Sequence, residues 1–213
     1  MLKNPFQRQG ILFCLSGPAG SGKTSIAQML LSSYQDSIRQ SVSYTTRTPR
    51  AGESDGKSYN FVNHETFLKM KQQGLFFEDE EIHGQYYATP RAAVEESIGG
   101  AYDLILVVDI KGALNFKRHF PDNCVICFII PPDFSELKKR MSSRGSVEEE
   151  ELNRRLATAR QELETLESIR NDPQAVDYLI LNENLNDTFS AVNSIIQVER
   201  FVLKRIKDKQ LIK

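Results

Sequence analysis

The sequence predicts an α/β fold in which a doubly wound parallel sheet carries a small inserted subdomain. Near-continuous apolar runs at 11–16, 104–109, 124–130 and 178–181 are typical of parallel strands covered on both faces. Helical patterns alternate with these runs, which favours strand–helix–strand units. Residues 40–90 differ, because they are more polar and are rich in glycine and aromatic side chains. That composition predicts a small, partly antiparallel subdomain inserted in the core.

The helical patterns follow from apolar residues spaced three and four apart, as at Ile26, Met29 and Leu30 in the first of them. The acidic run at 148–151 is expected to be the solvated start of a long helix, where the helix dipole favours negative charge. The predicted helices lie at about 24–35, 64–73, 90–98, 111–118, 133–142, 147–170 and 187–207.

The composition is that of an ordinary globular protein. The 213 residues are 40% hydrophobic and 26% charged, with a net charge of −1, so nothing favours nucleic acid or an acidic membrane as a partner. No apolar run approaches the ~18 residues of a membrane span. The first six residues lack the apolar centre of a secretion signal, so we expect a cytoplasmic protein.

The cysteines raise the possibility of a redox or metal site, because Cys124 and Cys127 have C-x-x-C spacing. They lie inside a β-branched apolar run, and no second Cys or His pair is near them in the sequence. We therefore predict buried free thiols, and the third cysteine, Cys14, falls in the first apolar strand. An odd number without a disulfide framework fits a reducing compartment.

The stretch that follows the first strand matches the phosphate-loop pattern G-x-x-x-x-G-K-[ST]. Glycines let successive backbone N–H groups point at an anion, and the following helix adds its positive end. Lys23 supplies a charge for the β- and γ-phosphates, and the Thr24 hydroxyl suits Mg²⁺. The predicted residues for the nucleotide phosphates are Gly17, Pro18, Ala19, Gly20, Ser21, Gly22, Lys23, Thr24 and Ser25.

A second candidate phosphate site lies in the polar segment. Arg47 and Arg50 flank Pro49, so a rigid turn can direct both guanidinium groups to one phosphate. Hydroxyl groups of Ser43, Tyr59 and Tyr87 can complete such a cage. From spacing alone, a pair of exposed loop arginines explains the pattern equally well.

The whole of this segment resembles the guanylate kinase signature. The matching residues are Ser41–Glu53 followed by Asp55–Phe61, and the resemblance extends from Ile11 to about Phe201. It also takes in the phosphate loop, Phe76-Phe77-Glu78, Tyr86–Pro90, Val108–Gly112, Lys139–Gly145 and Leu179–Asn182. A signature whose special residues recur in order over most of the chain is far more specific than the loop alone.

The resemblance implies transfer of the γ-phosphoryl group of MgATP to GMP and dGMP, as in purine nucleotide metabolism. ATP would be the co-substrate and Mg²⁺ the metal, with no nucleic acid, membrane or obligate protein partner. It also implies one domain with three parts: a GMP-binding subdomain at 40–96, a lid at 139–170, and a core at 10–39, 97–138 and 171–207.

The resemblance assigns the acceptor site residue by residue. Glu78 and Thr89 would read the guanine edge, since a carboxylate accepts from N1–H and N2–H₂ together and adenine lacks that donor pair. The neighbouring acids at 79–81 are expected to be solvated. Asp109, at the end of a strand, would bind Mg²⁺ through water or order the acceptor. The residues expected to hold the GMP phosphate are Ser43, Arg47, Arg50, Tyr59 and Tyr87.

The resemblance also supplies a set of catalytic cations that would stabilise charge on the transferring phosphoryl group. Pairing of the lid arginines with the acids at 148–151 is the alternative. Asn182 would lie near the adenine, and a backbone cap is an equal alternative for it. The predicted catalytic residues are Lys23, Arg47, Arg140, Arg144 and Arg155.

The chain departs from the family pattern at three positions. Val107 stands where an acid is usual, Lys111 where glutamine is common, and Ala88 in place of a glycine. Lys111 is expected to face solvent, and the alternative is that its charge partly replaces the lost organisation of Mg²⁺. Two rival functions remain: a phosphopeptide-binding module of the same fold, and a kinase for another phosphorylated acceptor such as a ribose bisphosphate. The complete phosphate loop argues against the first, and Glu78 with Thr89 argues against the second.

Overall fold

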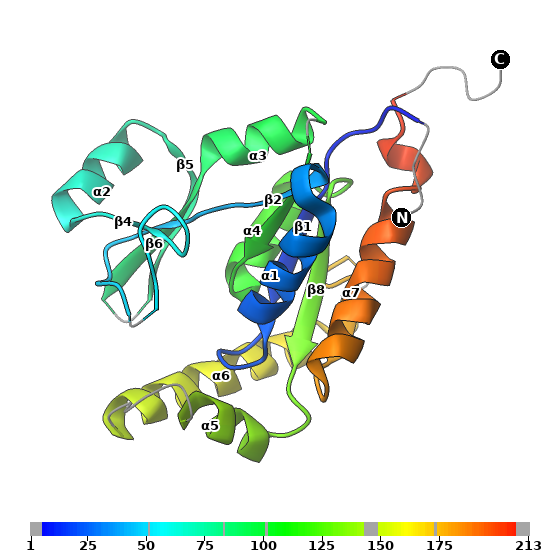
Figure 1. Ribbon diagram of the computed structural model, residues 1–213. Helices are drawn as coiled ribbons and strands as arrows, with labels where there is room; N and C mark the ends of the chain where they lie inside the picture. The colour runs from blue at the N-terminus through cyan, green and yellow to red at the C-terminus, as the bar shows by residue number, and fades with distance from the viewer. Residues whose placement is uncertain are drawn as a thin grey trace.

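The computed structural model describes residues 6–50, 52–82, 84–100, 102–142, 149–172 and 174–207, and the statements below concern these residues. The chain forms a central sheet flanked by helices, a second sheet at one side and a helical pair below (Figure 1).

The central sheet is parallel, with strand order β2-β7-β1-β8-β9. β1 lies in the middle, and the order of the strands reverses there, so its carboxyl end opens at the position where such folds bind ligands. The four predicted strands are confirmed. The strands are β1 (Leu12–Ser16), β2 (Ile38–Gln40), β7 (Asp103–Val107), β8 (Cys124–Ile130) and β9 (Tyr178–Leu181).

Two elements end well before the residue that the sequence predicts. The strand predicted at 104–109 ends at Val107, because Asp109 already caps the next helix. The helix predicted at 187–207 ends at Glu199, followed by a short 3₁₀ turn at Leu203–Arg205. Strand β2 was not predicted, because it has three residues and only Ile38 of them is buried.

Helices cover both faces of this sheet, as the doubly wound prediction requires. Phe13 and Leu15 of β1 pack with α1 and α7, and Leu12 and Cys14 pack with α3 and α4. Strictly alternating side chains of one strand thus enter two separate cores. The four helices are α1 (Lys23–Tyr34), α3 (Arg91–Ile98), α4 (Ile110–His119) and α7 (Leu185–Glu199).

The inserted subdomain is a mixed four-stranded sheet of order β4-β3-β6-β5. Phe67 of α2 packs with Phe76 and Ala88 in a small core of its own. The predicted boundary at residue 96 stays untested, although Val94 of α3 already packs in the central core. The elements are β3 (Tyr44–Thr45), β4 (Asn60–Phe61), α2 (His64–Gln72), β5 (Phe76–Ile82) and β6 (Gln85–Pro90).

The helical pair consists of α5 (Phe134–Ser142) and α6 (Glu149–Ile169), which lie below the sheet in Figure 1. Leu137, Met141 and Ala159 form a separate small core between them. This core is separate from the two main cores, and α6 also contacts α4 of the central layer. This is the region predicted to be the lid.

The predicted buried thiols are confirmed. Cys14, Cys124 and Cys127 are free and buried, and the Sγ atoms of Cys14 and Cys124 are 3.6 Å apart. Burial raises the pKa of Cys14 and that of Cys127, so both stay protonated and unreactive at neutral pH. Among the described residues, no helix is both long and apolar enough to cross a membrane.

Candidate active site

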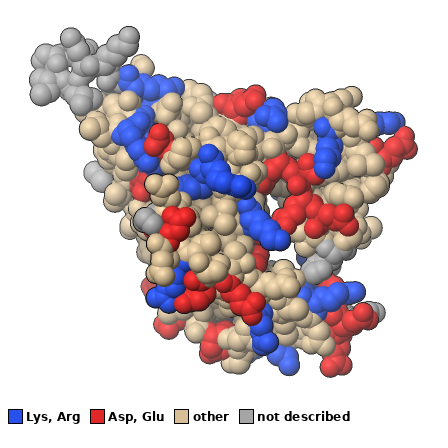
Figure 2. Space-filling view, turned by 180° about the vertical axis from the view of Figure 1, so that it is seen from behind, with Lys and Arg blue, Asp and Glu red and all other residues tan. Residues whose placement is uncertain are grey.

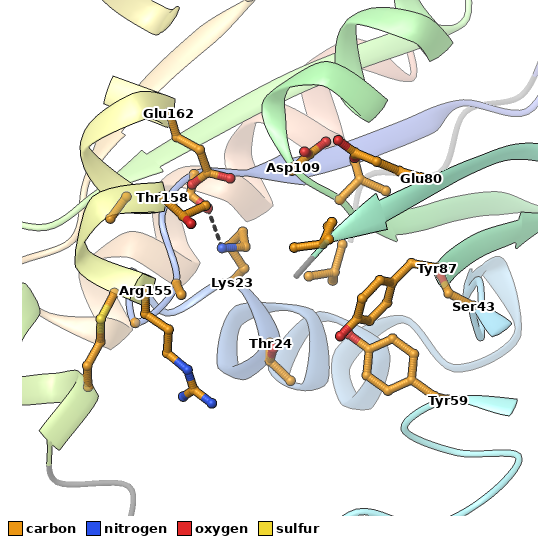
Figure 3. Close-up of a pocket in the computed structure, with 18 of the residues that line it drawn as sticks. Lys23, Thr24, Ser43, Tyr59, Glu80, Tyr87, Asp109, Arg155, Thr158 and Glu162 are labelled. Atoms are coloured by element: carbon orange, nitrogen blue, oxygen red, sulfur yellow. Dashed lines mark hydrogen bonds between the residues drawn. The ribbon is translucent and has the colours of Figure 1, made fainter. Parts of the chain in front are cut away.

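The main cavity, of about 340 Å³, lies where the core, the inserted subdomain and the lid meet. Its walls come from the phosphate loop, from β5 and β6, from the residues after β7, and from α6 (Figure 3). In Figure 2 the molecule is hollowed between the subdomain and the lid, and acidic side chains lie on both sides of the hollow. Three separately packed parts thus share one site.

The phosphate loop connects β1 to the start of α1. Gly17 has φ 126°, and a Cβ there would lie 2.1 Å from the carbonyl oxygen of Ile129, so only glycine fits. Lys23 opens α1 and donates to the carbonyl oxygens of Gly17 and Pro18, the latter at 3.0 Å. The lysine is thereby folded over the loop, with the helix N-terminus behind it.

Asn182 stabilises this loop through a hydrogen bond to its backbone. Its Nδ2 donates to the carbonyl oxygen of Ser21 at 2.7 Å, and its Oδ1 accepts from the Thr188 hydroxyl at 2.9 Å. The Asn182 side chain is buried, and it caps a backbone carbonyl group of the loop. A second cavity, of about 320 Å³, opens beside it and includes Ser25 and Leu185.

The two predicted lid arginines that the structure describes line different cavities. Arg155 of α6 lines the main cavity and donates to Glu151 at 2.8 Å. Arg140 of α5 instead lines the second cavity, where it pairs with Glu136 at 2.8 Å and donates to the carbonyl oxygen of Asn182 at 3.1 Å. Arg144 lies outside the described residues.

The predicted phosphate cage is mostly assembled. Ser43, Arg50, Tyr59 and Tyr87 all line the main cavity, and the rings of the two tyrosines meet edge to face at 5.9 Å. The pKa of Arg50 is lowered, first by burial and then by the charges of Arg155 and of the second arginine in its loop. Cations from the subdomain and the lid therefore face one another, which favours an anion between them.

Arg47 is the exception, because it does not line the cavity. Its guanidinium forms a bidentate pair with Glu53, at 2.8 and 2.9 Å. Glu53 also accepts from the backbone N–H of Arg50 at 2.8 Å, so it fixes the loop that carries both arginines. Burial alone would lower the pKa of Arg47, but hydrogen bonds to Glu53 and Tyr87 outweigh it and raise the pKa.

Glu78 lies on the opposite wall, on β5. Thr89 faces it across the antiparallel pair β5–β6 and donates to its Oε1 at 3.4 Å, while Asn115 of α4 donates to its Oε2 at 3.4 Å. Burial raises the pKa of Glu78 to about 7, and the Asp109 charge adds to this while the Asn115 bond opposes it. A half-buried acid with two weak partners is suited to receive the N–H groups of a ligand.

Asp109 stands two residues beyond the end of β7 and caps α4, accepting from the Gly112 N–H at 2.7 Å. Its carboxyl also lines the main cavity. Glu80 comes from β5 to meet it, as Figure 3 shows, and the prediction that Glu80 is solvated is wrong. Burial and the hydrogen bond to Asp109 raise the pKa of Glu80 to about 7. Val107 lines the same cavity, and Lys111 is exposed as predicted.

Comparisons with known proteins agree with this arrangement. The family model described as guanylate kinase matches residues 9–199. This chain belongs to the guanylate kinase family. Members of the family are ATP-dependent nucleoside monophosphate kinases.

The relatives cover nearly the whole chain. It is 40% identical over 196 residues to a guanylate kinase of Thiobacillus denitrificans, which spans 92% of this chain and 90% of that one. It is 38% identical to a guanylate kinase of Thermotoga maritima, with 94% and 93% covered. The crystal structure of guanylate kinase from Anaplasma phagocytophilum is similar with a TM-score of 0.76 at 30% identity, covering 95% and 92%.

Two acids that line the main cavity, Glu80 and Glu162, were not predicted from the sequence. Glu80 had a usable signal, because residues two apart in a strand share a face and Glu78 was already assigned to the site. Asp79 lies on the other face and pairs with Lys71 at 2.5 Å. Glu162 lies seven residues after Arg155, which is two helical turns along the same face of α6.

The residues present fit Mg²⁺. Thr24, Asp109 and Glu162 bring hydroxyl and carboxylate oxygens to one cavity, and the buried Oε2 of Glu162 has no hydrogen-bond partner among the described residues. In the described ranges, no three His, Cys, Asp or Glu side chains are placed to hold a metal by themselves. Mg²⁺ commonly binds through one or two carboxylates plus substrate phosphates and water, so this set suits an ion that arrives with the nucleotide.

Proposed function

We propose that this protein transfers the γ-phosphoryl group of MgATP to GMP or dGMP in the cytoplasm, giving ADP and the guanosine diphosphate. The observation that carries the proposal is that one cavity joins a complete phosphate loop to a second anion site and to Glu78. The donor and the acceptor phosphates would then share a single cavity of about 340 Å³.

The acceptor half explains the preference for guanine. The Glu78 carboxylate accepts from N1–H and N2–H₂ of the base, and the Thr89 hydroxyl adds a partner at the same edge. Adenine has no such donor pair, so its binding would leave a half-buried carboxylate without hydrogen bonds. Arg50, Tyr59 and the other cage residues hold the phosphate, which aligns the acceptor oxygen with the donor.

Catalysis needs no strong base, because the acceptor phosphate is already ionised at neutral pH. The protein positions the two phosphates and stabilises charge as the phosphoryl group moves. Lys23 serves the β- and γ-phosphates, Arg155 approaches from the lid, and Arg140 and Asn182 lie on the donor side near the second cavity. Mg²⁺ held with Thr24 and Asp109 would neutralise charge on the triphosphate. Closure of the lid excludes water, the competing acceptor.

A coupled assay of ADP formation tests the proposal. The enzyme is supplied with MgATP and, in turn, GMP, dGMP, AMP, CMP, UMP and ribose bisphosphate. We expect turnover with the two guanine nucleotides, and preference for any other acceptor would refute the assignment.

Lys23→Ala should abolish turnover while GMP still binds, because Lys23 serves the donor phosphates. The exposed Lys69, which pairs with Glu65 on α2, provides the control, and Lys69→Ala should be fully active. Full turnover by Lys23→Ala would exclude the assigned role of Lys23.

A further inference from the structure

The helix α6 presents both a cation and an acid to the cavity. The proposed phosphoryl transfer uses only the cation, Arg155. Arg155, Thr158, Ala159 and Glu162 all line the main cavity, and their spacing places them on one face of α6. Ala159 is buried against α5, which fixes the rotation of α6. At 1.5 Å per residue, Arg155 and Glu162 lie about 10 Å apart on this face. Any movement of the helix carries both charges together.

Glu162 is an acid at the phosphate end of the site. Figure 3 shows its carboxylate directed from α6 toward the side of the cavity that holds Lys23. Its Oε2 is buried without a hydrogen-bond partner among the described residues. Burial raises the pKa of Glu162 to about 7, the charge of Lys23 opposes that rise, and the charge of Asp109 adds to it. Contact of α6 with α4, which Asp109 caps, agrees with this location.

At pH 8, where Glu162 is mostly ionised, a carboxylate in this position repels a bare triphosphate. Buried charges are tolerated where they are paired or meet a metal ion, and within the described part of the chain nothing hydrogen-bonds to Oε2 of Glu162. When the triphosphate carries a divalent cation, the interaction changes from repulsion to attraction. The cation therefore decides whether closing α6 over the donor is favourable.

We propose that Glu162 makes lid closure depend on the divalent cation, favouring closure over a magnesium-bound triphosphate and opposing closure over a metal-free one. Glu162 is thus a positioning residue and touches no reacting atom. The inference rests on the proposed use of MgATP. Its consequence is that the lid does not close on a donor lacking the charge neutralisation that transfer requires.

Calorimetry with a non-hydrolysable ATP analogue tests this directly. Affinity is measured with saturating Mg²⁺ and with EDTA, for the wild type, Glu162→Gln, Glu162→Asp and Glu164→Gln. Glutamine keeps the shape and removes the charge, and Glu164 is an exposed acid on the same helix. We expect the ratio of metal-loaded to metal-free affinity to fall about tenfold in Glu162→Gln. The ratio should be partly kept in Glu162→Asp and unchanged in Glu164→Gln.

Thermal melting of the nucleotide-free enzyme separates this role from a structural one. An acid whose pKa is raised by burial from 4.5 to about 7 destabilises the fold as the pH rises from the lower value to the higher one, and the effect is complete above the higher one. Glu162→Gln should therefore melt at a higher temperature than the wild type at pH 8, with a smaller difference at pH 5.5. A residue needed for packing would instead lower the melting temperature at both pH values.

Three results would overturn the inference: an unchanged affinity ratio in Glu162→Gln, an equal loss of affinity with and without Mg²⁺, or a lower melting temperature at both pH values. The proposed function is tested separately, by GMP-dependent ADP formation in the wild type. If that activity is missing while the affinity ratio still falls in Glu162→Gln, the proposed function fails and the coupling to the cation stands.

Discussion

We expect GMP binding to weaken about tenfold when the pH falls from 8 to 6, because Glu78 takes up a proton. Burial raises the pKa of Glu78 to about 7, and the neighbouring Asp109 charge adds to this. Such an acid is about nine-tenths ionised at pH 8 and about one-tenth at pH 6. Only the ionised form accepts from both N–H groups of guanine, so affinity follows the ionised fraction. The difference corresponds to about 1.4 kcal/mol.

The assay is calorimetric titration with GMP at pH 6, 7 and 8, without ATP or metal. The variants are Glu78→Gln and Glu81→Gln, the second being an exposed acid on the same strand and the opposite face. The phosphate of GMP also titrates near pH 6, but it does so equally for all three proteins. The ratio of wild-type to Glu78→Gln affinity therefore isolates Glu78. An equal pH dependence in the wild type and Glu78→Gln would refute the reasoning.

Three further outcomes are expected. Gly112→Ala places a Cβ 3.1 Å from Glu78 Oε1, so the KM for GMP should rise about tenfold while that for ATP stays the same in steady-state kinetics. Glu53→Gln breaks the bidentate pair with Arg47 and should cost about 1–3 kcal/mol of GMP binding by calorimetry, and an unchanged Kd would contradict this. Phe13→Ala removes a fully buried ring and should lower the free energy of unfolding by about 3–5 kcal/mol in urea titrations; a loss below about 1 kcal/mol would count against the assigned core.

The parts of the fold that were predictable are those in which neighbouring residues carry the signal. β1 and β8 are continuous apolar runs because helices cover both faces, and the phosphate loop is a contiguous motif. β2 lacked such a signal, since its pairing with β7 is long-range and one buried residue, Ile38, cannot define a strand. The end of α7 was missed because apolar residues continue past Glu199 into the turn at 203–205.

The sequence predicted correctly which residues line the cavity where a motif assigns a residue one role. It was less successful where several acids stand next to one another. Arg50 and Tyr59 reach the cavity as expected. Arg47 could not be separated from Arg50 by spacing, because its pairing depends on the fold of the loop around Glu53. Glu80 was missed because the acids at 79–81 were all expected to be solvated, although alternation along β5 places Glu80 on the same face as Glu78.

The position of Glu80 also shows which side chain supplies a second carboxyl group near Asp109, where Val107 replaces the usual acid. Val107 brings no acid to the end of β7, yet Asp109 still has a second carboxyl beside it, delivered by β5 of the inserted subdomain. That subdomain has its own small core, separate from the central one. The second acid near Asp109 therefore comes from the inserted subdomain, as Glu162 comes from the lid. Both acids have pKa values raised to about 7, so the assembled site keeps charges that cost stability above neutral pH. Buried acids with raised pKa values are expected at sites where a bound ligand, rather than the folded chain, supplies the partner for their charge.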